Sequence, residues 1–112
     1  MFIKPKNCSR EATKLIKKNI KKGFKFGKSE EYIKYNAWVT YYEAEEELKH
    51  FRKLFFTNKE IRSGEVRYTL YFIYSGRRGR AYVITFRENE IRVITAWIMG
   101  RSTIRKIKKK HL

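Results

Sequence analysis

The sequence predicts an α+β fold in which two N-terminal helices pack on a three- or four-stranded antiparallel sheet, followed by a short basic C-terminal helix. Before residue 60 the apolar residues recur at helical spacing, and from Glu65 onward they alternate with a period of two. A length of 112 residues suits one packed core. We therefore expect a single basic domain over 1–112, with 101–112 as a basic C-terminal segment.

The first predicted helix begins after a Ser9 cap and ends near Lys22, where Gly23 supplies the stop. Its apolar positions at helical spacing are Ala12, Leu15, Ile16, Ile20 and Phe24. Its other face carries lysines, which are either a solvated surface or a set of phosphate contacts.

The second helix is predicted from a capping box, in which Thr40 and Glu43 each accept a backbone N–H of the other residue. An apolar stripe follows it at Tyr41, Ala44, Leu48, Phe51 and Phe55. Ser29 precedes a possible short helical turn between these two helices.

Three strands and a last helix complete the prediction. The first strand runs from Glu65 to about Tyr74, and the glycine-containing loop 75–80 turns the chain into the second, Ala81–Arg87. A tight turn at 88–89 leads to the third, which ends near Ile98. Ser102 then caps a basic helix that extends to about His111.

The predicted register assigns side chains to the two sheet faces. A two-residue turn at 88–89 pairs Thr85 with Arg92, and a four-residue loop at 76–79 brings alternate residues of the first strand to the same face. That face, expected to be exposed, carries Tyr68, Leu70, Phe72, Tyr74, Arg87 and Arg92. The more apolar set, expected under the helices, is Arg67, Tyr71, Ile73, Tyr82, Ile84, Phe86, Val93 and Trp97. A slip of one residue would exchange the faces.

The charge of the chain indicates an anionic partner. It has 28 Lys and Arg against 11 acidic residues, a net charge of +17, and the basic residues run along its whole length. Such a chain repels itself when compact, and a nucleic acid, RNA in particular, would relieve that repulsion. An apolar fraction of 42% favours a folded module over a disordered polycation.

The residue inventory argues against metal and cofactor chemistry. All 11 acids are Glu, scattered without the clustering of a Mg²⁺ site, and one Cys with two His cannot complete a zinc site. No run approaches the ~20 apolar residues that cross a bilayer, and no signal-peptide core is present, so we expect a cytoplasmic protein without membrane contact. Abundant Lys, Glu and Ile without Gln is typical of thermophiles.

Two basic clusters are candidate nucleic-acid contacts. The loop cluster is Arg77, Arg78 and Arg80, which could alternatively serve only to keep a turn soluble. The C-terminal cluster is Arg101, Arg105, Lys106, Lys108, Lys109 and Lys110. Such a tail binds polyanions without reading sequence.

The segment from Tyr68 to Lys110, with its closing RVITAW strand and Gly-Arg step, resembles the RelE-like toxins and the barnase- and colicin-like small ribonucleases. That resemblance implies RNA cleavage without metal, by attack of the 2′-hydroxyl on the adjacent phosphate. Arg87 and Arg92 would stabilise the phosphorane, and Tyr68, Tyr71 or His111 would transfer protons. An acidic antitoxin-like protein is the implied partner.

Two other classes remain open. The chain could be a non-catalytic DNA- or RNA-binding protein, such as a regulator or a viral or plasmid accessory factor. It could also be an interaction module whose charge serves solubility, which would bind any polyanion weakly. Cleavage in EDTA separates the first hypothesis from both.

Overall fold

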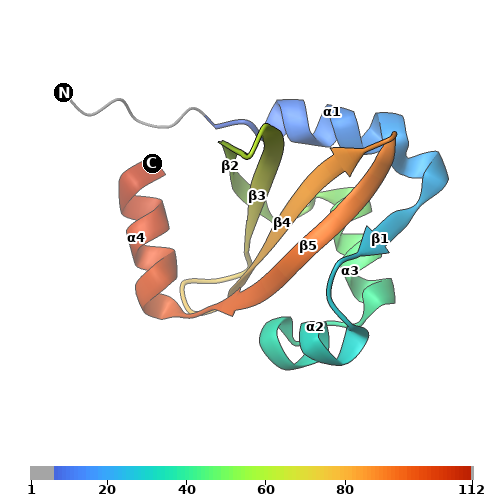
Figure 1. Ribbon diagram of the computed structural model, residues 1–112. Coiled ribbons are helices and arrows are strands. Elements are labelled where there is room, and N and C mark those ends of the chain that lie inside the picture. Colours follow the sequence, from blue (N-terminus) through green and yellow to red (C-terminus); the bar gives the residue numbers. More distant parts are fainter. Residues whose placement is uncertain (1–6, 112) are drawn as a thin grey trace.

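A five-stranded sheet runs through the middle of the molecule, with helices on both of its faces (Figure 1). This computed structural model describes residues 7–111. The elements are, in chain order, α1 (Ser9–Asn19), a 3₁₀ turn (Ile20–Lys22), β1 (Phe24–Phe26), α2 (Glu30–Ala37), α3 (Tyr41–His50), β2 (Leu54–Arg62), β3 (Glu65–Ile73), β4 (Gly79–Arg87), β5 (Glu90–Met99) and α4 (Arg101–His111).

The sheet has the order β1-β5-β4-β3-β2. Strands β2 to β5 form an antiparallel meander, and the short β1 lies parallel to β5 at the edge. The α+β class is therefore confirmed, whereas the expected all-antiparallel sheet of three or four strands is wrong, because β1 makes the sheet mixed and brings it to five strands.

The predicted capping box is confirmed at the start of α3, where Thr40 Oγ1 accepts from the Glu43 N–H and Glu43 reaches back to the Thr40 N–H. The helix ends earlier than its apolar stripe suggested, since Phe51 takes a left-handed φ of 57° and closes it. Phe55 therefore belongs to β2. The short turn after Ser29 is a full helix, α2, capped by the Ser29 side chain.

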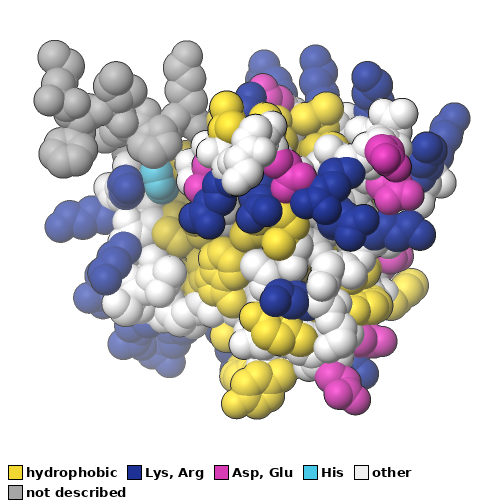
Figure 2. All heavy atoms as spheres, in the orientation of Figure 1, with side chains coloured by type: hydrophobic (Ala, Val, Ile, Leu, Met, Phe, Trp, Pro, Cys, Tyr) yellow, Lys and Arg dark blue, Asp and Glu magenta, His cyan; other side chains and the backbone are white. Residues whose placement is uncertain are grey.

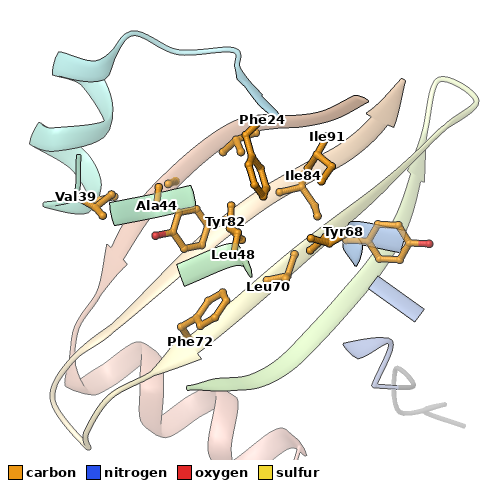
Figure 3. Close-up of a cluster of buried hydrophobic side chains, with 14 of the residues drawn as sticks. Phe24, Val39, Ala44, Leu48, Tyr68, Leu70, Phe72, Tyr82, Ile84 and Ile91 are labelled. Carbon is orange, nitrogen blue, oxygen red and sulfur yellow. The ribbon is translucent and has the colours of Figure 1, made fainter. Parts of the chain in front are cut away.

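The main core lies between the sheet and helices α1, α2 and α3 (Figure 3). Its fully buried side chains include Ile16, Ile33, Leu48, Leu70, Phe72, Tyr82, Ile84, Ile91 and Val93. The strands contribute alternate residues to this core, as a half-covered sheet requires.

The pairing of β3 with β4 corrects the predicted faces. Five residues separate the paired Ile73 and Gly79, so Phe72 lies opposite Arg80 and not opposite Val83. This difference of three residues is odd, and an odd shift moves every β3 side chain to the other face. Tyr68, Leu70 and Phe72 are consequently buried under the helices. Arg67, Tyr71 and Ile73 point to the opposite face, contrary to the prediction.

A bulge in β5 corrects one more position. Ile84 pairs with Val93, but its neighbour Val83 pairs with Thr95, which leaves one extra residue in β5. The bulge reverses the alternation, so Trp97 leaves the helix-covered face where the sequence placed it. It packs in a second cluster, on the other side of the sheet.

Helix α4 covers part of this second side. Ile104 and Ile107, one turn apart on the helix, pack with Ala81, Met99 and Trp97 from β4 and β5. The helix begins at Arg101, two residues earlier than predicted, because the Gly100 carbonyl accepts the first helical hydrogen bond, from the Ile104 N–H at 3.0 Å. Within residues 7–111, α4 is the one helix that lies over this side of the sheet (Figure 1).

Gly79 should be indispensable for this register. An added Cβ would lie 2.7 Å from the Phe72 carbonyl oxygen and 2.8 Å from Met99 Cε. Because the carbonyl belongs to a paired strand and cannot move freely, Gly79→Ala should lower the free energy of unfolding by about 1–3 kcal/mol in urea titrations. Gly76→Ala is the matched control, since nothing lies within 4 Å of its Cβ. Equal stability of the two variants would contradict this account.

Candidate nucleic-acid interface

The side of the sheet that α4 leaves uncovered bears a row of polar and basic side chains, which we call the open face. It contains Lys25, Asn58, Arg67, Thr69, Thr85, Arg87, Arg92 and Thr95, brought together by the register of the strands. Figure 2 shows Lys and Arg side chains gathered across the end of the sheet and around α4, with an apolar area between them. Thr69 and Thr85 are buried. The same pairing places Glu60, Glu65 and Glu90 on this face, so its charge is set by the arginines and these carboxylates together.

Glu65 partly neutralises two of these arginines. Its carboxylate accepts from Arg87 Nε at 2.5 Å and Nη2 at 3.1 Å, and from Arg67 Nε at 3.2 Å. The hydrogen bond with Arg87 is the main cause that lowers the pKa of Glu65 to about 2. The carboxylate therefore holds both guanidinium groups in place at neutral pH.

Arg92 differs from these two arginines because it forms no ion pair within the described part of the chain. It lies between Lys25 of β1 and Thr85 of β4, and its Nε atom is buried without a hydrogen-bond partner among residues 7–111. A buried guanidinium N–H without an acceptor carries a desolvation cost. Its full charge is available to an anion that approaches the open face.

Where the open face meets the C-terminal half of α4, a hollow of about 260 Å³ opens, which we call the histidine hollow. It is lined by Phe56, Asn58, Tyr71, Lys106, Ile107, Lys110 and His111. The His111 ring stacks on Phe56 with centroids 3.6 Å apart, which fixes its orientation. Burial, and then the charge of Glu60, raise the pKa of Tyr71, so its hydroxyl remains protonated at neutral pH.

A second hollow, of about 520 Å³, lies between α4 and the β3–β4 loop, and we call it the arginine hollow. It is lined by Gly76, Arg77, Arg101, Ile104, Arg105, Lys108 and Lys109. The β3–β4 loop and the C-terminal segment, predicted as separate binding clusters, thus contribute to one basic surface. Because none of the described residues that line this hollow is acidic, it is suited to a phosphate-rich ligand.

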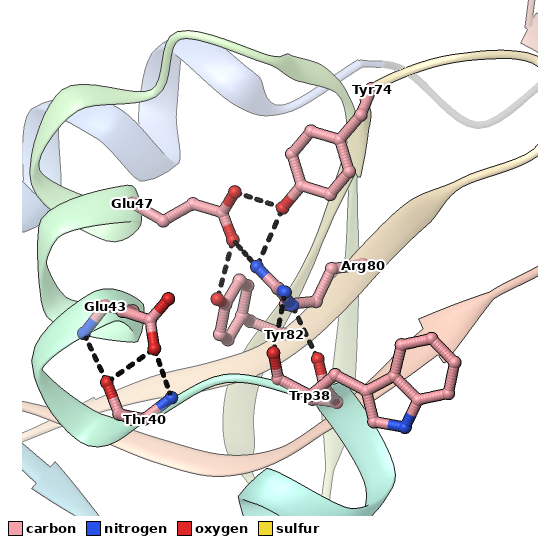
Figure 4. Close-up of polar contacts among 8 residues, drawn as sticks. Trp38, Thr40, Glu43, Glu47, Tyr74, Arg80 and Tyr82 are labelled. Carbon is pink, nitrogen blue, oxygen red and sulfur yellow. Dashed lines mark hydrogen bonds and ion pairs between the residues drawn. The ribbon is translucent and has the colours of Figure 1, made fainter.

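Arg80, the third predicted arginine of the loop cluster, lies elsewhere (Figure 4). Its guanidinium is directed toward the α2–α3 segment, where it pairs with Glu47 at 2.9 Å and donates to the carbonyls of Ala37 and Trp38. Tyr74 and Tyr82 complete the group through their hydroxyls, both of which donate to Glu47. Only about a sixth of the Arg80 and Glu47 side chains is exposed, so this arginine is a structural link.

Tyr68, predicted to transfer protons, lies on the helix-covered side, opposite Arg87 and Arg92. Its hydroxyl donates to Glu11 Oε2 at 2.6 Å, and Lys59 binds the same oxygen at 2.8 Å. Burial is the largest cause that raises the pKa of Tyr68. The other proton-transfer candidates, Tyr71 and His111, do come together.

Sequence reasoning missed Asn58 and Phe56, which line the histidine hollow, and Lys25, which borders Arg92. Their strands β2 and β1 gave no period-two signal, because β2 begins with three apolar residues and β1 has only three residues. The residues themselves could be read in the sequence, but without a strand signal their positions in the sheet could not be predicted.

Within residues 7–111, no three His, Cys, Asp or Glu side chains are grouped so that they could hold a metal ion. None of the helices described in this range has the length and apolar character of a bilayer-spanning helix.

Comparisons of the chain with protein-family models, with curated proteins and with solved structures found no match.

Replacing Arg80 should destabilise the fold, unlike replacing its neighbour in the loop. Arg80→Ala leaves the buried Glu47 carboxylate without its cation, and removal of one partner of such a pair costs about 3–5 kcal/mol. Arg78→Ala removes an exposed side chain and should change stability by less than about 0.5 kcal/mol. Chemical denaturation of both variants measures the contrast, and a stable Arg80→Ala protein would refute the structural role.

The Glu65 cluster should make stability depend on acid pH. Its pKa is about 2 in the folded protein against 4.5 ordinarily, so its contribution is complete above about pH 4.5 and is lost as the pH falls toward 2. Thermal melts should find Glu65→Gln less stable than wild type at pH 6, with a gap that closes below about pH 3. Glu88→Gln, at an exposed turn position, is the control. A gap that does not vary with pH would contradict the linkage.

Proposed function

We propose that the protein binds single-stranded RNA across the open face and α4, and that it cleaves the RNA in the histidine hollow without a metal ion. The observation that carries this proposal is the meeting of Tyr71 and His111 with Lys106 and Lys110 in one hollow. A proton donor, a proton acceptor and two cations are the components of phosphodiester transesterification.

The binding part is supported by the distribution of charge. Helix α4 lines both hollows, and the histidine hollow adjoins the open face through Asn58. Arg67 and Tyr71 are four residues apart on β3, about 13 Å along the strand. An extended single strand of a few nucleotides spans that distance, so phosphates held at the arginines would bring the next linkage to the hollow.

The chemical part assigns one role to each group. The His111 imidazole accepts the proton of the 2′-hydroxyl, whose oxygen attacks the neighbouring phosphorus. The bond from phosphorus to the 5′-oxygen breaks, and the protonated Tyr71 supplies the proton that the leaving oxygen takes up. Lys106 and Lys110 stabilise the charge that develops on the phosphorane. The products are a 2′,3′-cyclic phosphate and a 5′-hydroxyl end, and no electrons are exchanged.

The likeness to RelE-like toxins supports the same reaction class. It assigns phosphorane stabilisation to Arg87 and Arg92, both of which belong to the open face. Arg92 is the better candidate of the two, because Glu65 already neutralises Arg87. An acidic antitoxin-like protein would be attracted to this basic side, and a cytoplasmic location would bring the protein to its RNA.

A binder of RNA or DNA without catalysis is the second candidate. The observation in its favour is the pairing of both Arg67 and Arg87 with Glu65, because an enzyme would keep such cations free for the transition state. A phosphate-binding surface needs only a net positive field, which the two hollows already supply.

Incubation with labelled single-stranded RNA and matched DNA in EDTA tests cleavage. Wild type should cut RNA only, because DNA lacks the attacking hydroxyl. His111→Ala and Tyr71→Phe should each lower the rate about 10²–10⁴-fold, the usual contribution of a general acid or base, while native gels still show binding. Arg92→Ala should lower both the rate of cleavage and the affinity for RNA.

Tyr32→Phe is the matched control, because that tyrosine is 41% exposed on α2, outside either hollow. It should cut like wild type. Intact RNA with a salt-sensitive mobility shift would exclude metal-free cleavage and leave the binding module. RNA cut equally well by Tyr71→Phe and His111→Ala would remove the reaction from the histidine hollow.

A further inference from the structure

The last turn of α2, the segment after it and the first turn of α3 expose three large aromatic rings, which we call the aromatic corner. Tyr35 is 82% exposed, Tyr42 72% and Trp38 64%. In Figure 4 the Trp38 ring points away from the polar group around Arg80. Trp and Tyr are the side chains that most often dominate binding energies at protein interfaces. Three of them within eight residues therefore mark a surface suited to a partner.

Hydrogen bonds from Arg80 fix the backbone of the aromatic corner. Trp38 takes a left-handed φ of 53°, a conformation that L-residues with a Cβ rarely adopt. Arg80 fixes it by donating to the carbonyls of Ala37 and Trp38 at 2.8 and 3.2 Å, while Glu47 anchors the guanidinium. A preorganised ring loses little conformational entropy on binding. The buried ion pair thus stabilises a backbone that presents an exposed Trp.

The sequence segment that carries the aromatic corner has a net charge opposite in sign to that of the rest of the chain. Residues 28–50 contain six Glu and three Lys, a net charge of −3, whereas the remaining residues contain 25 Lys and Arg and five Glu, a net charge of +20. Phosphate groups are repelled by such an acidic segment. Carboxylates beside exposed rings instead attract Lys and Arg side chains. These cations form ion pairs with the carboxylates and cation–π contacts with the rings.

We propose that the aromatic corner of one molecule docks on the α4 helix of a second copy of this chain. The arginine hollow supplies the complementary surface, with Arg101, Arg105, Lys108 and Lys109 around the apolar Ile104. Its volume of about 520 Å³ accommodates an aromatic ring. The two surfaces differ, so the contact is heterologous, and copies join head to tail into rings or open chains.

Docking of this kind covers part of the surface to which RNA binding was assigned above. A second copy and RNA would then compete for the same lysines and arginines, so free RNA would release the basic face. This consequence alone rests on the proposed function. The self-association itself follows from the two surfaces and can be measured without nucleic acid.

The first test is the mass of the intact protein by sedimentation velocity and light scattering. The average mass should rise over a concentration series that reaches about 200 μM in about 50 mM NaCl, and association should weaken at least about tenfold in about 500 mM NaCl. A wild-type protein that remains monomeric at the highest concentration and low salt would overturn the proposal. Ile61→Ser, at a 70% exposed position of β2, is the control and should associate normally.

Complementation then identifies the two surfaces. The corner variant carries Trp38→Asn, which tolerates the left-handed backbone, together with Glu31→Lys, and the helix variant carries Arg105→Glu with Lys109→Glu. Each variant alone should be monomeric, and their mixture should form a one-to-one dimer from the intact corner of one and the intact α4 of the other. Circular dichroism melts verify that both are folded.

Further outcomes separate the self-association from the competition with RNA. If the helix variant alone still associates, the contact joins corner to corner and head-to-tail docking is wrong. If association behaves as expected but a single-stranded RNA oligonucleotide leaves the mass unchanged, docking stands and RNA binding at α4 loses its support. Dissociation by RNA, with a midpoint that tracks RNA binding, supports both.

Discussion

The register between β3 and β4 is the constraint on which the rest of the structure depends. Because Ile73 pairs with Gly79, the apolar residues of β3 enter the main core, and Tyr71 and Arg67 reach the side of the sheet that α4 borders. A shift by one residue would bury Arg67 and expose Leu70, so core and candidate site are specified by the same pairing. The glycine allows the close approach of β3, β4 and Met99 that this register needs.

Much of the secondary structure could be predicted from the sequence, because local signals determine it. The capping box at Thr40 and the alternating residues of β3 to β5 depend on neighbours along the chain. Which side chains lie on which face of the sheet depended on two features that local signals do not determine. One is the length of the loop between β3 and β4, and the other is a bulge in β5 next to Val93. Arg80 was assigned to RNA because Glu47, 33 residues away, is recognisable as its partner only in the fold.

The sequence identified several residues of the candidate site, but not how they are brought together. Tyr71, His111 and the lysines of α4 were selected by residue type, and their meeting depends on the return of α4 over the sheet. That return is an effect of packing, since Ile104 and Ile107 bury against Trp97 and its neighbours. The two apolar residues of an otherwise basic helix thus determine which cations lie beside Tyr71. Tyr68 was excluded by the register alone.

The separation of charge gives the molecule two unlike ends. A chain of +17 gains solubility from self-repulsion but loses stability when compact, and the acidic segment 28–50 offsets part of that repulsion. Two of these carboxylates, Glu30 and Glu46, form exposed pairs with lysines of their own helices, and such pairs contribute little to stability. Among residues 7–111, no acidic side chain lines either hollow, although the charge of Glu60 acts on Tyr71, and this makes both hollows attractive to phosphate. The same separation makes the basic side attractive to any aromatic and acidic surface, the protein's own corner included.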